Sequence, residues 1–421
     1  MQGKFRVVLG AVTGNVVEYY DFGIYTVFAA IIGRLFFSSS DHEILLAFAV
    51  FSVGFMMRPL GALVFGYIGD SFGRRKALII SMLGMSLSTL CIGLLPSYES
   101  IGIVAPIVLV IIRMIQGLCI GGEGTGSAIY ILEHMSKSKA SLMASIVMTS
   151  NIIGTLVANI VAMILEITLG IDDITWRYCF FIGAIMGCIS LYFRIRNEET
   201  PEFQKAKANN ISKSKKAPVT NIIQKKKYAV LTIFAIAACA TSITYLVRGY
   251  LNVFLSESLQ YTTHSALQYT IFTLTCLTIF FPVFGLLTDR FGTNTILNFG
   301  AFTTFFFILP AWYLVVYTSG ISQYLGLLCI AIMGAAVGAP AYPHAIHTFP
   351  PEIRYSGIAL GWNLGNAFFG GTTPIICTLL YEHFGLLGPA FYLIFTSSIF
   401  IVLRWIVTIY MIRLKNRKSF I

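Results

Sequence analysis

Long apolar runs, separated by short polar or Gly/Pro-containing breaks, extend along almost the whole chain. A helix needs about 20 apolar residues to cross a bilayer, and the runs offer about twelve segments of that length. We expect helices at about residues 7–33, 44–69, 77–96, 103–132, 140–168, 177–196, 228–256, 265–288, 295–317, 321–348, 354–381 and 388–412. Strand-like alternation over segments of about ten residues is absent, which argues against a membrane β-barrel.

Composition agrees with a chain that is solvated by lipid. Hydrophobic residues make up 57% of the 421 residues and charged residues only 11%, too few to coat a water-soluble protein of this size. The first apolar stretch carries Glu18 and Asp21 and is not followed by a small-residue cleavage site, so we expect a retained helix rather than a signal peptide. All eight cysteines fall inside expected helices, which indicates neither disulfides nor a metal site. We expect no cofactor.

Positive charge decides the expected orientation, because Lys and Arg resist transfer across the membrane. One set of alternate connections, which includes both termini and the central connector, carries nearly all the cations. The other set is acidic, and its only cations are Arg34 and Arg177 at helix ends. We therefore expect a multi-pass protein of the cell inner membrane with both termini in the cytoplasm. The net charge of +11 reflects this topology and attraction to the lipid bilayer, and it gives no support to nucleic-acid binding.

An internal repeat divides the chain into two similar halves. The pattern G-x-x-x-D-x-F-G occurs at 66–73, between the second and third expected helices, and again at 285–292, between the eighth and ninth. A polar, Lys-rich segment separates the copies. We expect a six-helix bundle at 1–196, a cytoplasmic linker at 197–227 and a second six-helix bundle at 228–421.

The repeated motif has a mechanical interpretation. Its first glycine lets two helices approach closely, its aspartate can face the positive end of a neighbouring helix, and its second glycine permits the turn. The cations that follow can pair with acids at neighbouring helix ends, and Glu133 is the expected partner of Arg74 or Arg75. We expect such contacts to hold the cytoplasmic side shut in one state. The gating set comprises Gly66, Asp70, Gly73, Arg74, Arg75, Glu133, Gly285, Asp289, Arg290, Gly292, Glu352 and Arg354.

Further motifs narrow the identification. They are Gly14–Phe22 in the first helix, Arg58–Gly61 in the second, Arg113–Gly117 with Gly121–Glu123 in the fourth, Trp176-Arg177, and Glu198–Phe203. With G-x-x-x-D-x-x-G-R-R-K at 66–76, they resemble the metabolite:proton symporter family of the major facilitator superfamily. The resemblance implies twelve helices in two bundles, with helices 1, 4, 7 and 10 lining a cavity. It also implies substrates such as proline, betaine or organic acids. Thr293-Asn294 replaces the Arg-Arg of the first copy, so the contacts that hold the cytoplasmic side shut should be weaker at the second copy of the motif.

Charged residues inside the membrane are costly, at about 2.5–3.5 kcal/mol each on insertion scales, and usually functional. Glu18 and Asp21 lie three apart on one helix face, so only one ionises easily. We expect Asp21 or Glu123 to be the proton site, with Glu18 coupled to it; the alternative is that each acid neutralises an arginine of the second or fourth helix. Arg113 is expected to bind a substrate carboxylate. Arg248 is expected either to bind it from the opposite half or to gate the outer end. Arg58 is expected to pack within the first half, with substrate contact as the less favoured alternative.

Polar and aromatic residues at the expected depth of the cavity complete the substrate site: Asn15, Tyr19, Tyr245, Trp362, Asn363 and Asn366. The sequence contains no hydrolytic or redox constellation and predicts a transporter, not an enzyme. We expect uptake of a small carboxylate-bearing or zwitterionic metabolite together with protons, by alternating access in a functional monomer. A proton-coupled exporter, an uncoupled facilitator or exchanger, and a membrane receptor remain alternatives.

Overall fold

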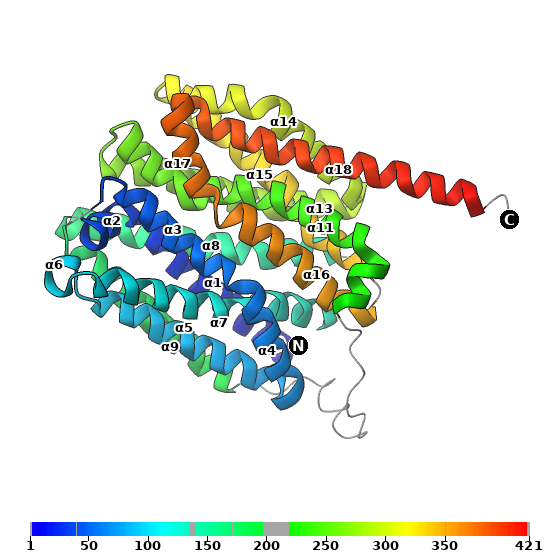
Figure 1. Cartoon of the computed structure of the whole chain (residues 1–421), viewed down its shortest axis with the longest axis horizontal. Coiled ribbons are helices and arrows are strands. Elements are labelled where there is room, and N and C mark those ends of the chain that lie inside the picture. Colours follow the sequence, from blue (N-terminus) through cyan, green and yellow to red (C-terminus); the bar gives the residue numbers. More distant parts are fainter. Residues whose placement is uncertain are drawn as a thin grey trace.

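The computed structural model describes residues 2–38, 40–134, 140–170, 172–196, 219–349 and 351–418. Within these ranges every regular element is helical (Figure 1). In chain order they are α1 (Gln2–Val27), α2 (Ala29–Phe37), α3 (Glu43–Met56), α4 (Arg58–Phe72), α5 (Arg74–Leu94), α6 (Tyr98–Ile101), α7 (Val104–His134), α8 (Ala140–Leu169), α9 (Thr175–Arg196), α11 (Val219–Tyr245), η2 (Leu246–Tyr250), α12 (Leu251–Val253), η3 (Phe254–Ser258), α13 (Thr263–Phe291), α14 (Thr293–Tyr317), α15 (Ile321–Thr348), α16 (Pro351–Gly365), η4 (Asn366–Gly370), α17 (Thr373–Phe384), η5 (Gly385–Leu387) and α18 (Gly388–Lys418).

Ten helices among the described residues are long and apolar enough to cross a membrane, or eleven if the bent pair α1–α2 counts as one span. The expected number was about twelve, and the difference lies in the last candidate span, Leu360–Val407, which has 48 residues. This segment reverses at Gly385, whose φ is 66°. Figure 1 shows α18 leaving the end of α17 and running back along the body, so the segment holds both of the last two expected helices. The chain is an all-helical, multi-pass membrane protein.

Four of the expected helices are interrupted. The helix expected over 44–69 breaks at Met57, between α3 and α4. The helix expected over 7–33 bends by 64° at Phe28, between α1 and α2. The helix expected over 228–256 contains the π-helical turns η2 and η3, and the one expected over 354–381 contains η4. A π-turn inserts one extra residue into a helix and is frequent at functional positions. Residues of η2 and η4 line the cavity described below.

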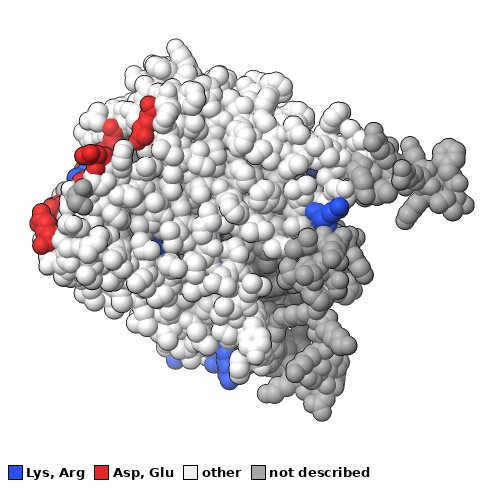
Figure 2. Space-filling view, in the orientation of Figure 1, with Lys and Arg blue, Asp and Glu red and all other residues white. Residues whose placement is uncertain are grey.

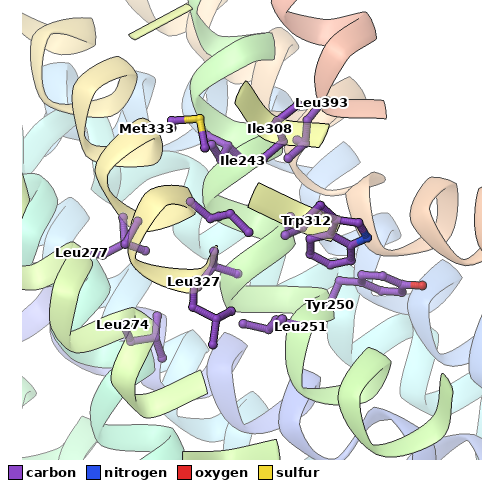
Figure 3. Packing of buried hydrophobic residues seen from close by; sticks show 14 of the residues in the cluster. Ile243, Tyr250, Leu251, Leu274, Leu277, Ile308, Trp312, Leu327, Met333 and Leu393 are labelled. Atoms are coloured by element: carbon purple, nitrogen blue, oxygen red, sulfur yellow. The ribbon is translucent and has the colours of Figure 1, made fainter. Parts of the chain in front are cut away.

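Two large groups of buried apolar side chains hold the helices together. One comes mainly from α1 to α9 and includes Phe51, Trp176 and Phe180. The other comes mainly from residues after position 242, and Figure 3 shows Trp312 and Tyr250 packed among aliphatic side chains of this group. Because lipid tails are as apolar as these side chains, close packing rather than the exclusion of water favours the association.

Charge is distributed unequally between the two ends of the bundle. Figure 2 shows the visible acidic side chains gathered at the left end of the view, where Figure 1 places α2 and α6, whereas most of the visible basic side chains lie away from it. We call this the acidic end. Its described acids lie in or next to the connections at that end: Asp41, Glu43, Glu99, Asp172, Asp173, Glu257 and Glu382.

Candidate functional site

A cavity is lined by helices from both parts of the chain, within the described ranges. Its walls come from α1, α4, α7 and α8 on one side and from α11, η2, α13, α15, α16 and η4 on the other. The lining residues are Asn15, Glu18, Tyr19, Arg58, Ile120, Gly121, Met148, Asn151, Ile152, Ala240, Thr241, Thr244, Tyr245, Arg248, Phe281, Gly338, Tyr342, Trp362, Asn363 and Asn366. Eight of the predicted site residues therefore meet here: Asn15, Glu18, Tyr19, Tyr245, Arg248, Trp362, Asn363 and Asn366.

Arg58 is the most deeply buried cation of this lining, with 3% of its surface exposed. Its guanidinium carbon lies 3.9 Å from the ring centre of Phe55 and 4.9 Å from that of Phe22. The Nε and Nη2 atoms have no hydrogen-bond partner among the described residues. Glu18 and Tyr19 interact with this cation electrostatically. Since a buried guanidinium normally finds partners for its donors, this side chain is suited to hold an anionic ligand group.

Close packing between two helices sets the position of Arg58. The Cβ of a residue larger than glycine at position 121 of α7 would lie 2.0 Å from the backbone oxygen of Arg58, and at position 117 it would lie 2.0 Å from that of Gly54. Gly121 opens the glycine-rich segment Gly121–Gly126, and its lack of a side chain is what permits this approach. The contact brings the first turn of α4 against α7, beside the cavity.

Several uncharged polar atoms in the lining also lack a partner within the described part of the chain. They are Asn15 Oδ1, Asn151 Oδ1, Tyr245 OH, Asn363 Nδ2 and Asn366 Oδ1. The orientation of the Asn15 amide follows from its neighbour. Ser150 Oγ donates to the carbonyl oxygen of Val147 at 2.6 Å and therefore accepts from Asn15 Nδ2 at 3.3 Å, which leaves Asn15 Oδ1 as the free acceptor. Donors and acceptors that converge on one cavity indicate a small polar ligand.

Aromatic rings form another part of the wall. Tyr342 and Trp362 pack edge to face, with ring centres 4.9 Å apart. The guanidinium carbon of Arg248 lies 4.3 Å from the ring centre of Tyr19 and 5.0 Å from that of Tyr245. Aromatic faces attract cations, so the cavity offers contacts for positive as well as negative ligand groups.

Asp21 and Arg113 lie outside this lining and bind each other. Arg113 Nη1 donates to Asp21 Oδ2 at 3.1 Å and to Gln116 Oε1 at 2.8 Å. Asp21 Oδ1 accepts from Thr89 Oγ1 at 2.7 Å and from Gln116 Nε2 at 3.1 Å. The four side chains form a buried polar network among α1, α5 and α7, and Tyr25 covers the guanidinium at 3.8 Å. Arg113 was expected to reach the cavity, but it is not among the lining residues, and its guanidinium binds Asp21 and Gln116 instead.

The two copies of the repeated motif are only partly described. In the second copy, Asp289 Oδ1 and Oδ2 accept from the backbone N–H groups of Ser141 and Leu142 at 3.1 Å each, which confirms the expected contact with a helix N-terminus. A Cβ at Gly285 would lie 2.2 Å from Ser145 Oγ, so the expected close approach is also present. At Gly66, however, no described atom lies within 4 Å of such a Cβ.

The turns of both copies follow the expectation. Gly73 and Gly292 have φ values of 111° and 86°, a region that side chains disfavour. Arg75 donates to the backbone oxygen of Ile195, and Arg290 lies 5.3 Å from the ring centre of Phe291. The other gating and proton-site side chains, together with most of the linker 197–227, lie outside the described residues: Asp70, Arg74, Glu123, Glu133, Glu352 and Arg354.

The sequence interpretation did not single out Asn151 and Thr155 of α8, and it favoured packing within the first half for Arg58. A signal for the first two was present, because polar residues recur at 151, 155 and 159, four residues apart in an apolar helix. Arg58 carried a weaker signal, since its helix is not among those that the family resemblance assigns to the cavity.

Comparison with known proteins identifies the family. The sequence profile of the Major Facilitator Superfamily matches residues 11–374. The Proline/betaine transporter of Escherichia coli (strain K12) is 34% identical over 416 residues, which cover 94% of this chain and 82% of the relative. The Glycine betaine/proline/ectoine/pipecolic acid transporter OusA of Dickeya dadantii (strain 3937) has the same identity and coverage. A Putative proline/betaine transporter of Staphylococcus aureus (strain MSSA476) is 32% identical, over 94% of this chain and 86% of the relative.

Solved structures show the same fold. A crystal structure of a D-xylose-proton symporter superposes with a TM-score of 0.75 at 18% identity, over 94% of this chain and 97% of the other. The inward-open xylose transporter XylE from E. coli superposes with a TM-score of 0.70 at 20% identity, over 94% and 95% of the two chains. The chain belongs to the Major Facilitator Superfamily, and it is a membrane transporter rather than an enzyme.

Proposed function

We propose that the protein takes up a small zwitterionic metabolite, such as proline or betaine, together with protons. The observation that carries the proposal is Arg58, a buried guanidinium that lines the cavity with two nitrogen atoms unpaired among the described residues. Aromatic rings and the carboxyl group of Glu18 lie in the same lining. The names of the relatives support this class of substrate, since they are transporters of proline and betaine.

Each end of a zwitterion has a partner in this cavity. The substrate carboxylate binds the free edge of Arg58, because a planar guanidinium matches a carboxylate in a bidentate arrangement. The ammonium group lies against Tyr342 and Trp362, where each ring contributes about 0.5–2 kcal/mol of cation–π attraction. The free amide oxygens of Asn15 and Asn366 accept from any N–H group that the substrate carries. Tyr19, Tyr245 and Asn363 supply the remaining polar contacts.

Glu18 is the proton site that best explains coupling. It interacts with the same Arg58 that the substrate carboxylate needs. When Glu18 is ionised it competes with the substrate for this cation, and when it is protonated the cation is free. Proton and substrate therefore favour each other's binding, as symport requires. Asp21 is already neutralised by Arg113 and hydrogen-bonded by Thr89 and Gln116, so it takes a secondary role in the proposal. Glu123 stays a candidate.

Transport proceeds by alternating access in the cell inner membrane. The bundles 1–196 and 228–421 rock about the cavity, and the linker 197–227 connects them on the cytoplasmic side, together with both termini. The gating residues of the two repeated motifs hold the cytoplasmic side closed in one state. A single chain contains the whole cavity, so a monomer suffices. The driving force is about 2.3 kcal/mol per charge per 100 mV and about 1.4 kcal/mol per pH unit.

The test combines binding with transport. Thermal melting of the purified protein is measured with proline, betaine, a dicarboxylate and a tricarboxylate, since a ligand of the folded state raises the melting temperature. Uptake of the stabilising solute into right-side-out vesicles is then measured with an imposed pH gradient. We expect accumulation that a protonophore abolishes. Efflux would indicate an exporter, and uptake that survives the protonophore would indicate a facilitator or exchanger.

Variants of Arg58 test the site itself. Arg58→Lys keeps the positive charge but loses the planar guanidinium that binds a carboxylate through two parallel hydrogen bonds, so we expect weaker substrate binding. Arg58→Gln should abolish substrate binding. Leu60→Gln, on the exposed surface of the same helix, is the matched control. Unchanged substrate binding by Arg58→Gln would show that Arg58 does not anchor the substrate. Glu18→Gln tests proton coupling, and we expect uptake by this variant to no longer depend on the proton gradient.

A further inference from the structure

The side chain of Arg248 crosses from one part of the chain to the other. It lies in η2, yet its Nε donates to Thr155 Oγ1 at 3.1 Å and its Nη2 donates to the backbone oxygen of Asn151 at 3.4 Å, both on α8. Its guanidinium carbon also lies 4.3 Å from the ring centre of Tyr19 of α1 and 5.0 Å from that of Tyr245 of α11. One side chain therefore joins α1 and α8 to the helices that follow the linker.

The backbone at the same position makes a second connection. The carbonyl oxygen of Arg248 accepts from Thr26 Oγ1 of α1 at 3.0 Å, and this hydroxyl also lies 2.9 Å from the carbonyl oxygen of Gly23. A π-turn shifts the register of the backbone hydrogen bonds, which leaves carbonyl groups available to side chains. Helix η2 thus presents both a cation and a backbone acceptor to the N-terminal part of the chain.

Neighbouring contacts close the same region, between the cavity and the acidic end. Ser52 Oγ of α3 lies 2.7 Å from the carbonyl oxygen of Gly371, just after η4, and a Cβ at Gly371 would lie 2.4 Å from the Cβ of Phe55. Asn252 Nδ2 donates to the carbonyl oxygen of Val27 at 3.4 Å. Helices η2 and η4 therefore both meet the N-terminal part of the chain here, and Arg248 is the cation at this contact.

The geometry points to Arg248 as a gating latch that holds the acidic end of the transporter closed and must release α8 for that end to open. The role differs from that of Arg58. Arg58 lines the cavity and has two nitrogens without a hydrogen-bond partner among the described residues, whereas Arg248 already uses two of its five donors on α8. The other donors of this half-buried side chain remain for a ligand in the cavity. A substrate carboxylate that binds these donors from the cavity side strengthens the contact of Arg248. Occupancy of the cavity by substrate thus favours closure of the acidic end.

Distances between spin labels at the acidic end test the latch without any substrate. Labels are placed at Glu99 and Glu382, two exposed positions on opposite sides of the closed contact, after replacement of the native cysteines. Thr155→Val keeps the shape of the side chain but removes the acceptor of Arg248 Nε. Thr168→Val is the matched control, because Thr168 lies on the exposed surface of the same helix and bonds only to its own helix.

We expect Thr155→Val and Arg248→Gln to raise the population of the long distance about tenfold, a change of about 1.4 kcal/mol. Arg248→Lys should lie between these and the wild type, and Thr168→Val should leave the distances unchanged. Equal distance distributions in the wild type, Thr155→Val and Arg248→Gln would overturn the latch, even if Arg248→Gln abolishes uptake. Thr155→Val retains the fold through its matched shape, and melting temperatures check this. Because no substrate is added, the distances test the role of Arg248 even if the proposed substrate is wrong.

Discussion

Asp289, near the end of α13, accepts hydrogen bonds from the backbone N–H groups of Ser141 and Leu142 at the start of α8. The first N–H groups of a helix have no partner within it, and the helix dipole makes this end positive. An aspartate from a distant helix therefore serves as a cap. At this end one carboxylate of α13 accepts two hydrogen bonds from α8, whereas near the acidic end Arg248, Thr26 and Ser52 contribute hydrogen bonds between the two parts of the chain.

Removal of this cap should weaken the contact between α8 and α13. We expect Asp289→Ala to destabilise it by about 0.5–2 kcal/mol, the usual cost of losing a helix cap, and Asp289→Asn to cost less, because the amide keeps an acceptor oxygen. Spin labels at the exposed positions Lys76 and Asn294 measure the separation at this end. The interpretation fails if Asp289→Ala and the wild type give the same distances. Arg290→Ala, next to the cap, is the control for a general loss of charge.

The first glycines of the two motifs should respond differently to alanine. At Gly285 a Cβ would lie 2.2 Å from Ser145 Oγ and 2.8 Å from its Cβ, so we expect a loss of about 1–3 kcal/mol from overpacking. At Gly66 no described atom lies within 4 Å, and alanine favours a helix by about 1 kcal/mol, so stability should stay equal or rise. Melting temperatures of the two variants compare these effects. Ser145→Gly should rescue Gly285→Ala, and a lack of rescue would show that the clash lies elsewhere.

The sequence predicted the turns and the Asp289 contact because their chemistry is local. A glycine at positive φ and an aspartate near a helix end are properties of a short motif, and Gly73, Gly292 and Asp289 behave as expected. The direction of a side chain around a long helix is not local. Asp21 follows Glu18 by three residues, yet Glu18 lines the cavity while Asp21 faces Thr89 and Gln116.

Because side-chain direction is not local, the sequence also assigned the roles of Arg58 and Arg113 the wrong way round relative to the cavity. A sequence shows that Arg58 and Arg113 are both costly in a membrane, but their partners come from helices far away along the chain. Arg113 meets Asp21 because α1 and α7 pack there. Arg58 reaches the cavity because Gly121 allows the start of α4, and Gly117 allows the end of α3, to lie close to α7. Which helix surfaces pack together, and hence which partner each arginine meets, depends on the arrangement of the complete bundle.

Asp172 should make stability depend on pH at the start of α9. Its Oδ1 accepts from Thr175 Oγ1 at 2.6 Å and from the backbone N–H groups of Thr175 and Ile174 at 2.7 Å and 2.9 Å. The Thr175 hydroxyl, followed by these N–H groups, holds the pKa of Asp172 below its ordinary value. The contribution to stability is therefore present above the pKa of the unfolded chain and is lost as the pH falls through the lower folded pKa.

We expect Asp172→Ala to lower the melting temperature at neutral pH, because the ionised carboxylate caps the helix. The gap between this variant and the wild type should narrow as the pH is lowered below about 3.9, the ordinary aspartate pKa. Asp173→Ala, one residue further along the connector, is the control and should show a smaller gap at every pH. A gap for Asp172→Ala that stays constant with pH would mean that the carboxylate charge plays no part.

Variants of Arg113 should lower the stability of the fold, whereas variants of Arg58 should lower ligand binding. Removal of one partner of a buried ion pair typically costs about 3–5 kcal/mol, so Arg113→Ala should lower the melting temperature without ligand, and Asp21→Ala should do the same. Arg58→Gln should instead leave that temperature nearly unchanged and remove the increase that the substrate produces. Thr89→Val deletes a hydroxyl that donates to the Asp21 carboxylate and accepts from Gln116 Nε2, so it should cost about 1.5–3 kcal/mol, the usual worth of a hydrogen bond to a charged group. Melting curves with and without substrate measure both quantities. A stable Arg113→Ala protein that has lost only its response to the substrate would return the role of substrate anchor to Arg113.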